Sequence, residues 1–149
     1  MSTAYAISQD MIDRFGEPEL VQLTDRSNTG AIDQTVLQRA LDDAGDELDT
    51  YIGSRYQLPL ASVPPVLTRL ACDVARYRLY DDLAPDEVRN RYKDAVALLT
   101  RISAGQLSLG LATAAPAAAS DLPQVKAPGR TLTTDSLADY QPGLTEFEN

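Results

Sequence analysis

The chain has 149 residues, of which 44% are hydrophobic and 23% are charged, which suits one domain with a real core rather than two large ones. Its formal net charge of −9 argues against a general nucleic-acid binder, which would carry a basic surplus. It has no histidine and a single cysteine, Cys72, so histidine-dependent hydrolysis and an intrachain disulfide are both excluded. No basic stretch followed by an apolar core stands near the start, so we expect no signal peptide and no membrane span.

Two short helices are predicted first. The apolar spacing from Ser8 to Phe15 predicts a helix with Ser8 as its N-cap and Gly16 as its stop. A second short helix is expected to begin at Glu17, because Pro18 and acidic side chains suit a first helical turn. A polar loop follows.

Three long helices are predicted next. Asp33 is expected to cap the first, which reaches about Tyr56. Prolines then require an extended elbow, and the proline pair at 64–65 opens the second helix. This helix is apolar around most of its circumference, so we expect it to be central and packed on several sides. The third is expected from about 86 to 104. The polar stripe of the central helix consists of Arg69, Asp73, Arg76 and Tyr80.

These elements predict an all-α fold, a small helical bundle of three long and two short helices with an extended C-terminal arm. We place the helical domain at residues 1–104 and the arm at residues 105–149, where prolines and alanines replace helical periodicity.

Two segments could hold a metal ion. The loop DRSNTGAID has the spacing of a calcium loop from Asp25 onward, but Val36 stands where a bidentate glutamate should be, so a turn ending in the Asp33 cap is favoured. The long acidic helix could instead bind a divalent ion, although such a run is typically a solvated face. The carboxylates that share this face are Asp42, Asp46 and Asp49.

Charge is segregated between helices, with acids on the first long helix and arginines on the last two. Surfaces of opposite sign favour head-to-tail association into a ring, while pairing within the chain is the alternative. Arg78 projects from an apolar arc and could pair with Asp82 inside the fold or contact a neighbouring subunit. The candidate subunit-interface residues are Asp42, Asp46, Asp49, Arg78, Arg89 and Arg91.

The arm contains GRTLTTDSLADYQPG, in which alternating Leu and Thr precede further apolar anchors. Plain disorder is one interpretation, and a linear segment that orders on a partner, by strand addition, is the favoured one. The candidate docking residues are Arg130, Leu132, Leu137 and Tyr140.

Several motifs in order, LVQLTD, TGAID, YIGSRYQLPL, VPPVLTRLACDVARYRLY and GRTLTTDSLADY, resemble the Mu-like phage head–tail joining proteins. The resemblance covers nearly the whole chain and is strongest over residues 51–82. It implies a small helical neck protein that forms a ring, expected to be twelvefold, below the portal. Such a ring bridges the portal to a tail-side stopper or terminator and lines the channel for DNA, without sequence-specific binding.

The resulting hypothesis is a structural adaptor of the virion neck, assembled in the host cytoplasm, with no enzymatic activity, cofactor or metal. Two alternatives remain open at this point. One is a carboxylate-dependent metal enzyme that uses the acidic helix, and the other is a regulatory module whose arm binds a host protein.

Overall fold

The computed structural model describes residues 4–114, and the arm residues Arg130, Leu132, Leu137 and Tyr140 lie outside this range. It confirms the all-α prediction of three long and two short helices. Within residues 4–114, no helix combines the length and apolar composition needed to cross a bilayer. The helices are α1 (Ser8–Phe15), α2 (Glu17–Thr24), α3 (Gln34–Ile52), α4 (Pro65–Tyr80) and α5 (Asp86–Ser103), with a 3-10 turn η1 (Asp81–Leu83) before α5.

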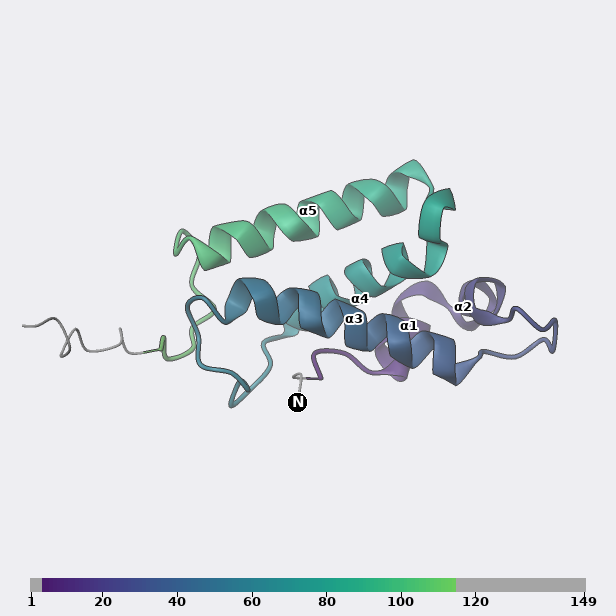
Figure 1. Cartoon of the computed structure of the whole chain (residues 1–149), viewed down its shortest axis with the longest axis horizontal. Helices are drawn as coiled ribbons and strands as arrows, with labels where there is room; N and C mark the ends of the chain where they lie inside the picture. Colours follow the sequence, from purple (N-terminus) through teal and green to yellow (C-terminus); the bar gives the residue numbers. More distant parts are fainter. Residues whose placement is uncertain (1–3, 115–149) are drawn as a thin grey trace, which may run out of the picture. The chain divides into compact units, whose positions relative to one another are not determined.

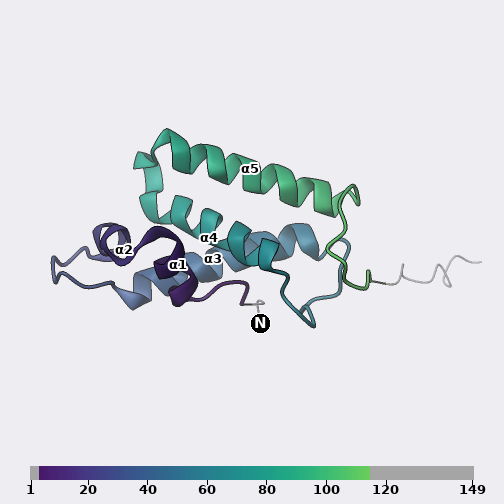
Figure 2. The ribbon, with the colours of Figure 1, turned by 180° about the vertical axis from the view of Figure 1, so that it is seen from behind.

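Helix α4 is central, as its apolar circumference predicts. It packs against each of the other helices, and α3 and α5 are its antiparallel neighbours (Figures 1 and 2). The short helices α1 and α2 pack on α3 and α4 away from α5. The core side chains with at most 2% exposure include Met11, Leu20, Leu37, Leu48, Ile52, Tyr56, Leu67, Leu70, Val74 and Leu99.

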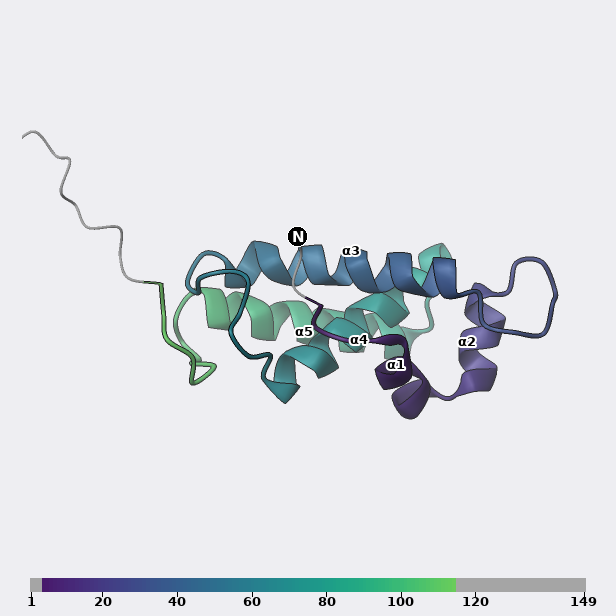
Figure 3. The same ribbon diagram turned by 90° about the horizontal axis from the view of Figure 1, so that it is seen from below.

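The alternating direction of α3, α4 and α5 gives this helical unit two distinct ends (Figure 3). One end holds the loop between α2 and α3 together with η1, where Arg26 Nη2 lies 3.7 Å from Asp81 Oδ2. The other end holds the elbow between α3 and α4 and the segment that follows α5. The antiparallel bridge between Tyr56 and Thr113 joins the elbow to that segment, so residues 105–114 are part of this end.

The helix starts follow the predicted caps with one exception. Asp33 caps α3, since its Oδ1 accepts from Thr35 N at 2.9 Å and Val36 N at 3.3 Å. The prediction of Ser8 as the cap of α1 is wrong. The cap is Ile7, whose N–H donates to Asp10 Oδ2 at 2.8 Å, because this acid satisfies the free donor without a hydroxyl.

Helix α3 ends at Ile52, four residues before the predicted Tyr56. The chain turns at Gly53, a poor helix former, and the Tyr56 N–H closes the turn on Ile52 O at 2.9 Å. In the elbow, Tyr56 is 1% exposed and Leu60 packs on the core, whereas Pro59 is exposed. The second long helix begins at the proline pair, as predicted.

Replacing Leu48 by alanine should lower the free energy of unfolding by about 2–5 kcal/mol, because the side chain is fully buried in the core and its removal leaves a cavity. Chemical denaturation monitored by circular dichroism measures this. The matched control is Leu83→Ala, which should stay within about 0.5 kcal/mol of the wild type because Leu83 is 87% exposed. Equal losses for both variants would contradict the described core.

Replacing Asp33 by alanine should cost about 1 kcal/mol of stability, since two N–H groups at the start of α3 lose their acceptor. Thermal or urea unfolding measures the change. Asp42→Ala, which removes an exposed carboxylate from the middle of the same helix, is the control and should change stability far less.

Candidate functional site: the charged faces of the helical unit

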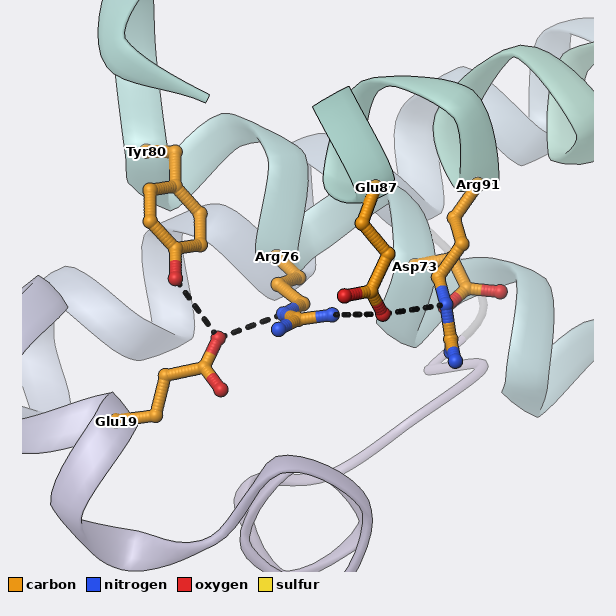
Figure 4. Close-up of polar contacts among 6 residues, drawn as sticks. All are labelled: Glu19, Asp73, Arg76, Tyr80, Glu87 and Arg91. Carbon is orange, nitrogen blue, oxygen red and sulfur yellow. Dashed lines mark hydrogen bonds and ion pairs between the residues drawn. The ribbon is translucent and has the colours of Figure 1, made fainter. Parts of the chain in front are cut away.

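Arg76 of α4 is the centre of a polar cluster that joins α2, α4 and α5 (Figure 4) and also contacts α1. Its Nε donates to Glu19 Oε1 of α2 at 2.7 Å, and the Tyr80 hydroxyl donates to the same oxygen at 3.1 Å. Its Nη1 lies 3.9 Å from Glu87 Oε1 of α5, and its guanidinium stands 4.5 Å from the centre of the Phe15 ring of α1. Burial opposes the charge of Arg76, but the bond to Glu19 leaves its pKa raised.

Arg91 extends this cluster along α5. Its Nε lies 3.4 Å from Glu87 Oε1, and its Nη1 lies 3.6 Å from Asp73 Oδ1 of α4. The Asp73 side chain is only 11% exposed, so burial raises the pKa of its carboxyl despite the nearby cations Arg91 and Arg69. The polar stripe of the central helix therefore serves to bind α2 and α5.

Glu47 forms a second cluster that joins the three long helices. Its Oε2 accepts from Arg78 Nη2 of α4 at 2.6 Å, and its Oε1 accepts from the Tyr92 hydroxyl of α5 at 2.9 Å. The Tyr92 ring stacks on Tyr77, with centroids 4.2 Å apart and an angle of 8° between the planes. Burial and the hydrogen bond to Glu47 raise the pKa of Tyr92 to about 12.

Arg78 therefore pairs inside the fold, but with Glu47 instead of the suggested Asp82. The chain leaves the helix at Asp81, whose φ of 50° carries Asp82 into the next turn. Glu47 reaches Arg78 because α3 runs antiparallel beside α4.

The acidic candidates of α3 divide into two groups. Asp42 and Asp46 are exposed, and Asp42 Oδ1 accepts from Gln38 Nε2 at 2.8 Å. Asp49 lies deeper and accepts a hydrogen bond from the Tyr5 hydroxyl near the start of the chain. Two of the three carboxylates are thus available to a partner, and the third helps to hold the N-terminal segment.

The basic candidates are mostly engaged within the chain. Arg78 and Arg91 form the contacts described above, and Arg89 donates to Ala84 O at 2.9 Å and lies 3.9 Å from Asp86 Oδ1. The segregation of charge left two interpretations open, association between copies and pairing within the chain. These contacts are of the second kind. A subunit-interface role for these residues stays a prediction, and any such role must compete with the contacts inside the fold.

Three cations of α4 and α5 form no ion pair within the described residues, namely Arg69, Lys93 and Arg101. Arg69 and Asp94 border a groove of about 280 Å³ between α4 and α5, together with the paired Asp73 and Arg91. The groove is polar and contains both signs of charge.

Neither metal hypothesis gains support from the geometry. In residues 4–114, no three acidic, cysteine or histidine side chains gather closely enough to hold an ion. Asp25 instead accepts from the N–H groups of Thr29 at 2.9 Å and Gly30 at 2.6 Å. These hydrogen bonds, of which the one from Thr29 has the largest effect, lower the pKa of the Asp25 carboxyl. They also hold the loop between α2 and α3 in one conformation.

Cys72 lies in the core of α4 with no exposed surface. Burial raises the pKa of its thiol to about 12, so the thiol stays protonated near neutral pH. It therefore packs as a small apolar side chain and does not serve as a nucleophile.

Sequence reasoning missed the acidic partners Glu19, Glu47 and Glu87. For Glu47 a signal was present, because it follows Ala44 by three positions and precedes Tyr51 by four, which places a carboxylate beside the apolar arc of α3. Glu19 and Glu87 lie in first helical turns, where acids are expected for the helix dipole, so their interhelical role had no separate signal.

The bond between Tyr92 and Glu47 predicts a pH dependence. In the unfolded chain, the Tyr92 hydroxyl has its ordinary pKa of 10.0. In the folded chain, the pKa of this hydroxyl is about 12. The stabilisation is therefore fully present below pH 10 and is lost as the pH rises to about 12. Unfolding of wild type and Tyr92→Phe across this range measures the difference.

The matched control is Tyr77→Phe, which alters the other ring of the stack and leaves the bond to Glu47 in place. It should keep the wild-type pH profile. Identical profiles for wild type and Tyr92→Phe would contradict the assignment.

Comparison with known proteins shows the family of this chain. The family described as Bacteriophage Mu, Gp36 matches residues 5–127. The Mu-like prophage FluMu protein gp36 of Haemophilus influenzae is 38% identical over 107 residues, which cover 72% of this chain and 76% of that protein. Gene product J of Escherichia phage Mu is 33% identical over 125 residues, which cover 82% and 89%. This chain therefore belongs to the Gp36 family of bacteriophage Mu.

Proposed function

We propose that this protein is a structural head–tail joining protein of a Mu-like phage. Copies of it assemble into a ring at the virion neck, below the portal and above a tail-side stopper or terminator, and line the channel through which DNA passes. The family membership carries the proposal, together with the resemblance of residues 51–82 to head–tail joining proteins.

The use of charge within the helical unit supports a structural role. The arginines and glutamates that could have formed a reactive site bridge helices, as in the contacts of Arg76 with Glu19 and of Arg78 with Glu47. Such partly buried, hydrogen-bonded pairs fix the relative positions of helices. A rigid body of this kind suits a protein whose task is to hold its neighbours in register.

The surplus of negative charge also suits a DNA channel. A chain with a net charge of −9 repels the phosphate backbone, so DNA can slide past it without being held. Ring contacts would then use the exposed Asp42 and Asp46 of one copy and cations of α4 and α5 on the next. The arm would contact the portal or an adjoining neck protein.

The proposal predicts that the full-length protein, mixed with the portal protein of the same phage, joins it as a ring visible by electron microscopy. Asp42→Lys should weaken this assembly by about tenfold or more, because it places like charges across the subunit contact. Titration of the protein onto the portal, followed by sedimentation, measures the effect.

Asp13→Lys is the matched control, because Asp13 accepts from Gln9 Nε2 at 2.8 Å just as Asp42 accepts from Gln38. It should assemble like the wild type. Failure of the wild-type protein to join the portal at any ionic strength would overturn the proposed function.

A further inference from the structure

Leu83 is an exposed apolar side chain on a turn whose backbone is held by the residues on either side of it. It is 87% exposed, whereas Ile7, the other large hydrophobic residue exposed in the described part of the chain, is 59% exposed. The turn is fixed on both sides of Leu83. Asp81 has a positive φ of 50°, and the carbonyl oxygen of the buried Ala84 accepts from Arg89 Nη2 at 2.9 Å. The outward position of Leu83 is therefore built into the fold.

A groove of about 220 Å³ lies at the other end of the helical unit. Its walls come from the elbow and from the segment after α5, and they are mostly apolar. The lining residues are Gln57, Pro59, Leu60, Ala61, Leu111 and Ala112.

Hydrogen bonds join the two walls of this groove, which we call the elbow groove. The Leu109 N–H donates to the Tyr56 hydroxyl at 3.0 Å, and the Ala114 N–H donates to Arg55 O at 2.9 Å. The groove is therefore formed before any partner arrives, which lowers the ordering cost of binding.

Leu83 and the elbow groove lie at opposite ends of the unit, so one copy cannot fill its own groove with its own Leu83 (Figures 1 and 3). An apolar projection and an apolar groove on different surfaces of one chain are the elements of a heterologous contact, which generates a ring when the rotation closes.

The charges around the two features are complementary. Asp82, next to Leu83, forms no ion pair within residues 4–114. At the groove end, neither Arg55, whose guanidinium lies against Gly105, nor Arg101 in the last turn of α5 forms an ion pair among the described residues. A carboxylate arriving with Leu83 would meet cations that the fold leaves unneutralised.

We infer that Leu83 of one copy inserts into the elbow groove of a second copy, and that this apolar contact links neighbouring subunits. The inference rests on the proposed ring and names its contact. Surface ion pairs alone add little affinity, and most cations of α4 and α5 are already paired within the chain. The insertion of Leu83 supplies the apolar burial that such an interface needs.

The test uses the full-length chain and variants that damage one side of the contact at a time. Leu83→Ser removes the projection, and Ala112→Trp fills the groove, with Ala61→Trp as a second groove variant. Each should weaken self-association, alone or on the portal, by roughly 10- to 100-fold, as expected for the loss of one buried leucine. Ile7→Ser, the matched exposed aliphatic change, should associate like the wild type. Circular dichroism should show equal folding for all.

A mixture of Leu83→Ser and Ala112→Trp gives the sharpest result. One variant keeps a working groove and the other keeps Leu83, so together they should form dimers but no larger species, measured by native mass spectrometry and sedimentation. Variants that assemble as the wild type does would overturn this contact and leave the proposed function standing. Loss of binding to the portal with unchanged self-association would assign Leu83 to another protein and also overturn it. A wild-type protein that never joins the portal would instead overturn the proposed function.

Discussion

Helix α4 carries apolar side chains around most of its circumference, and the need to bury them organises the rest of the described fold. No single neighbour can cover such a surface, so α3 and α5 take two sides and the α1–α2 pair takes part of a third. The hydrophobic burial on several sides supplies the main stabilisation and fixes which helices meet. The short helices, too short to be stable alone, depend on this packing as well.

The packing of helices around α4 also buries part of its polar stripe. Asp73 and Arg76 cannot extend freely into water once α2 and α5 flank them, with exposures of 11% and 12% for their side chains. A charge in this position is costly unless it is paired. Partners on the flanking helices, Glu19 and Arg91, meet that requirement. The charged network is therefore a consequence of burying α4, and it ties the outer helices to the centre.

Much of the fold could be predicted from local signals. Asp33 as a cap, the 64–65 proline pair as a helix start and the apolar periodicity of α4 are each decided by a few neighbouring residues. The pairing of charges could not be predicted in the same way, because it depends on how helices cross. Arg78 had an acid in the next turn of sequence, yet its partner Glu47 is 31 residues away. Tyr56 fits the helical spacing of α3, which is why the predicted helix extended too far. In the fold, Tyr56 lies beyond the end of α3, and its hydroxyl accepts from the Leu109 N–H of the segment after α5.

The contact of Tyr56 with Leu109 also bears on the order of folding. These residues are 53 positions apart, and the whole of α4 and α5 lies between them. Two residues so far apart in the sequence seldom meet in an unfolded chain, so we expect this contact to form once α4 and α5 have folded and docked between them. The elbow groove, one wall of which comes from residues 105–114, is therefore complete only once the helices have packed, so a partly folded copy presents no finished groove to a neighbour.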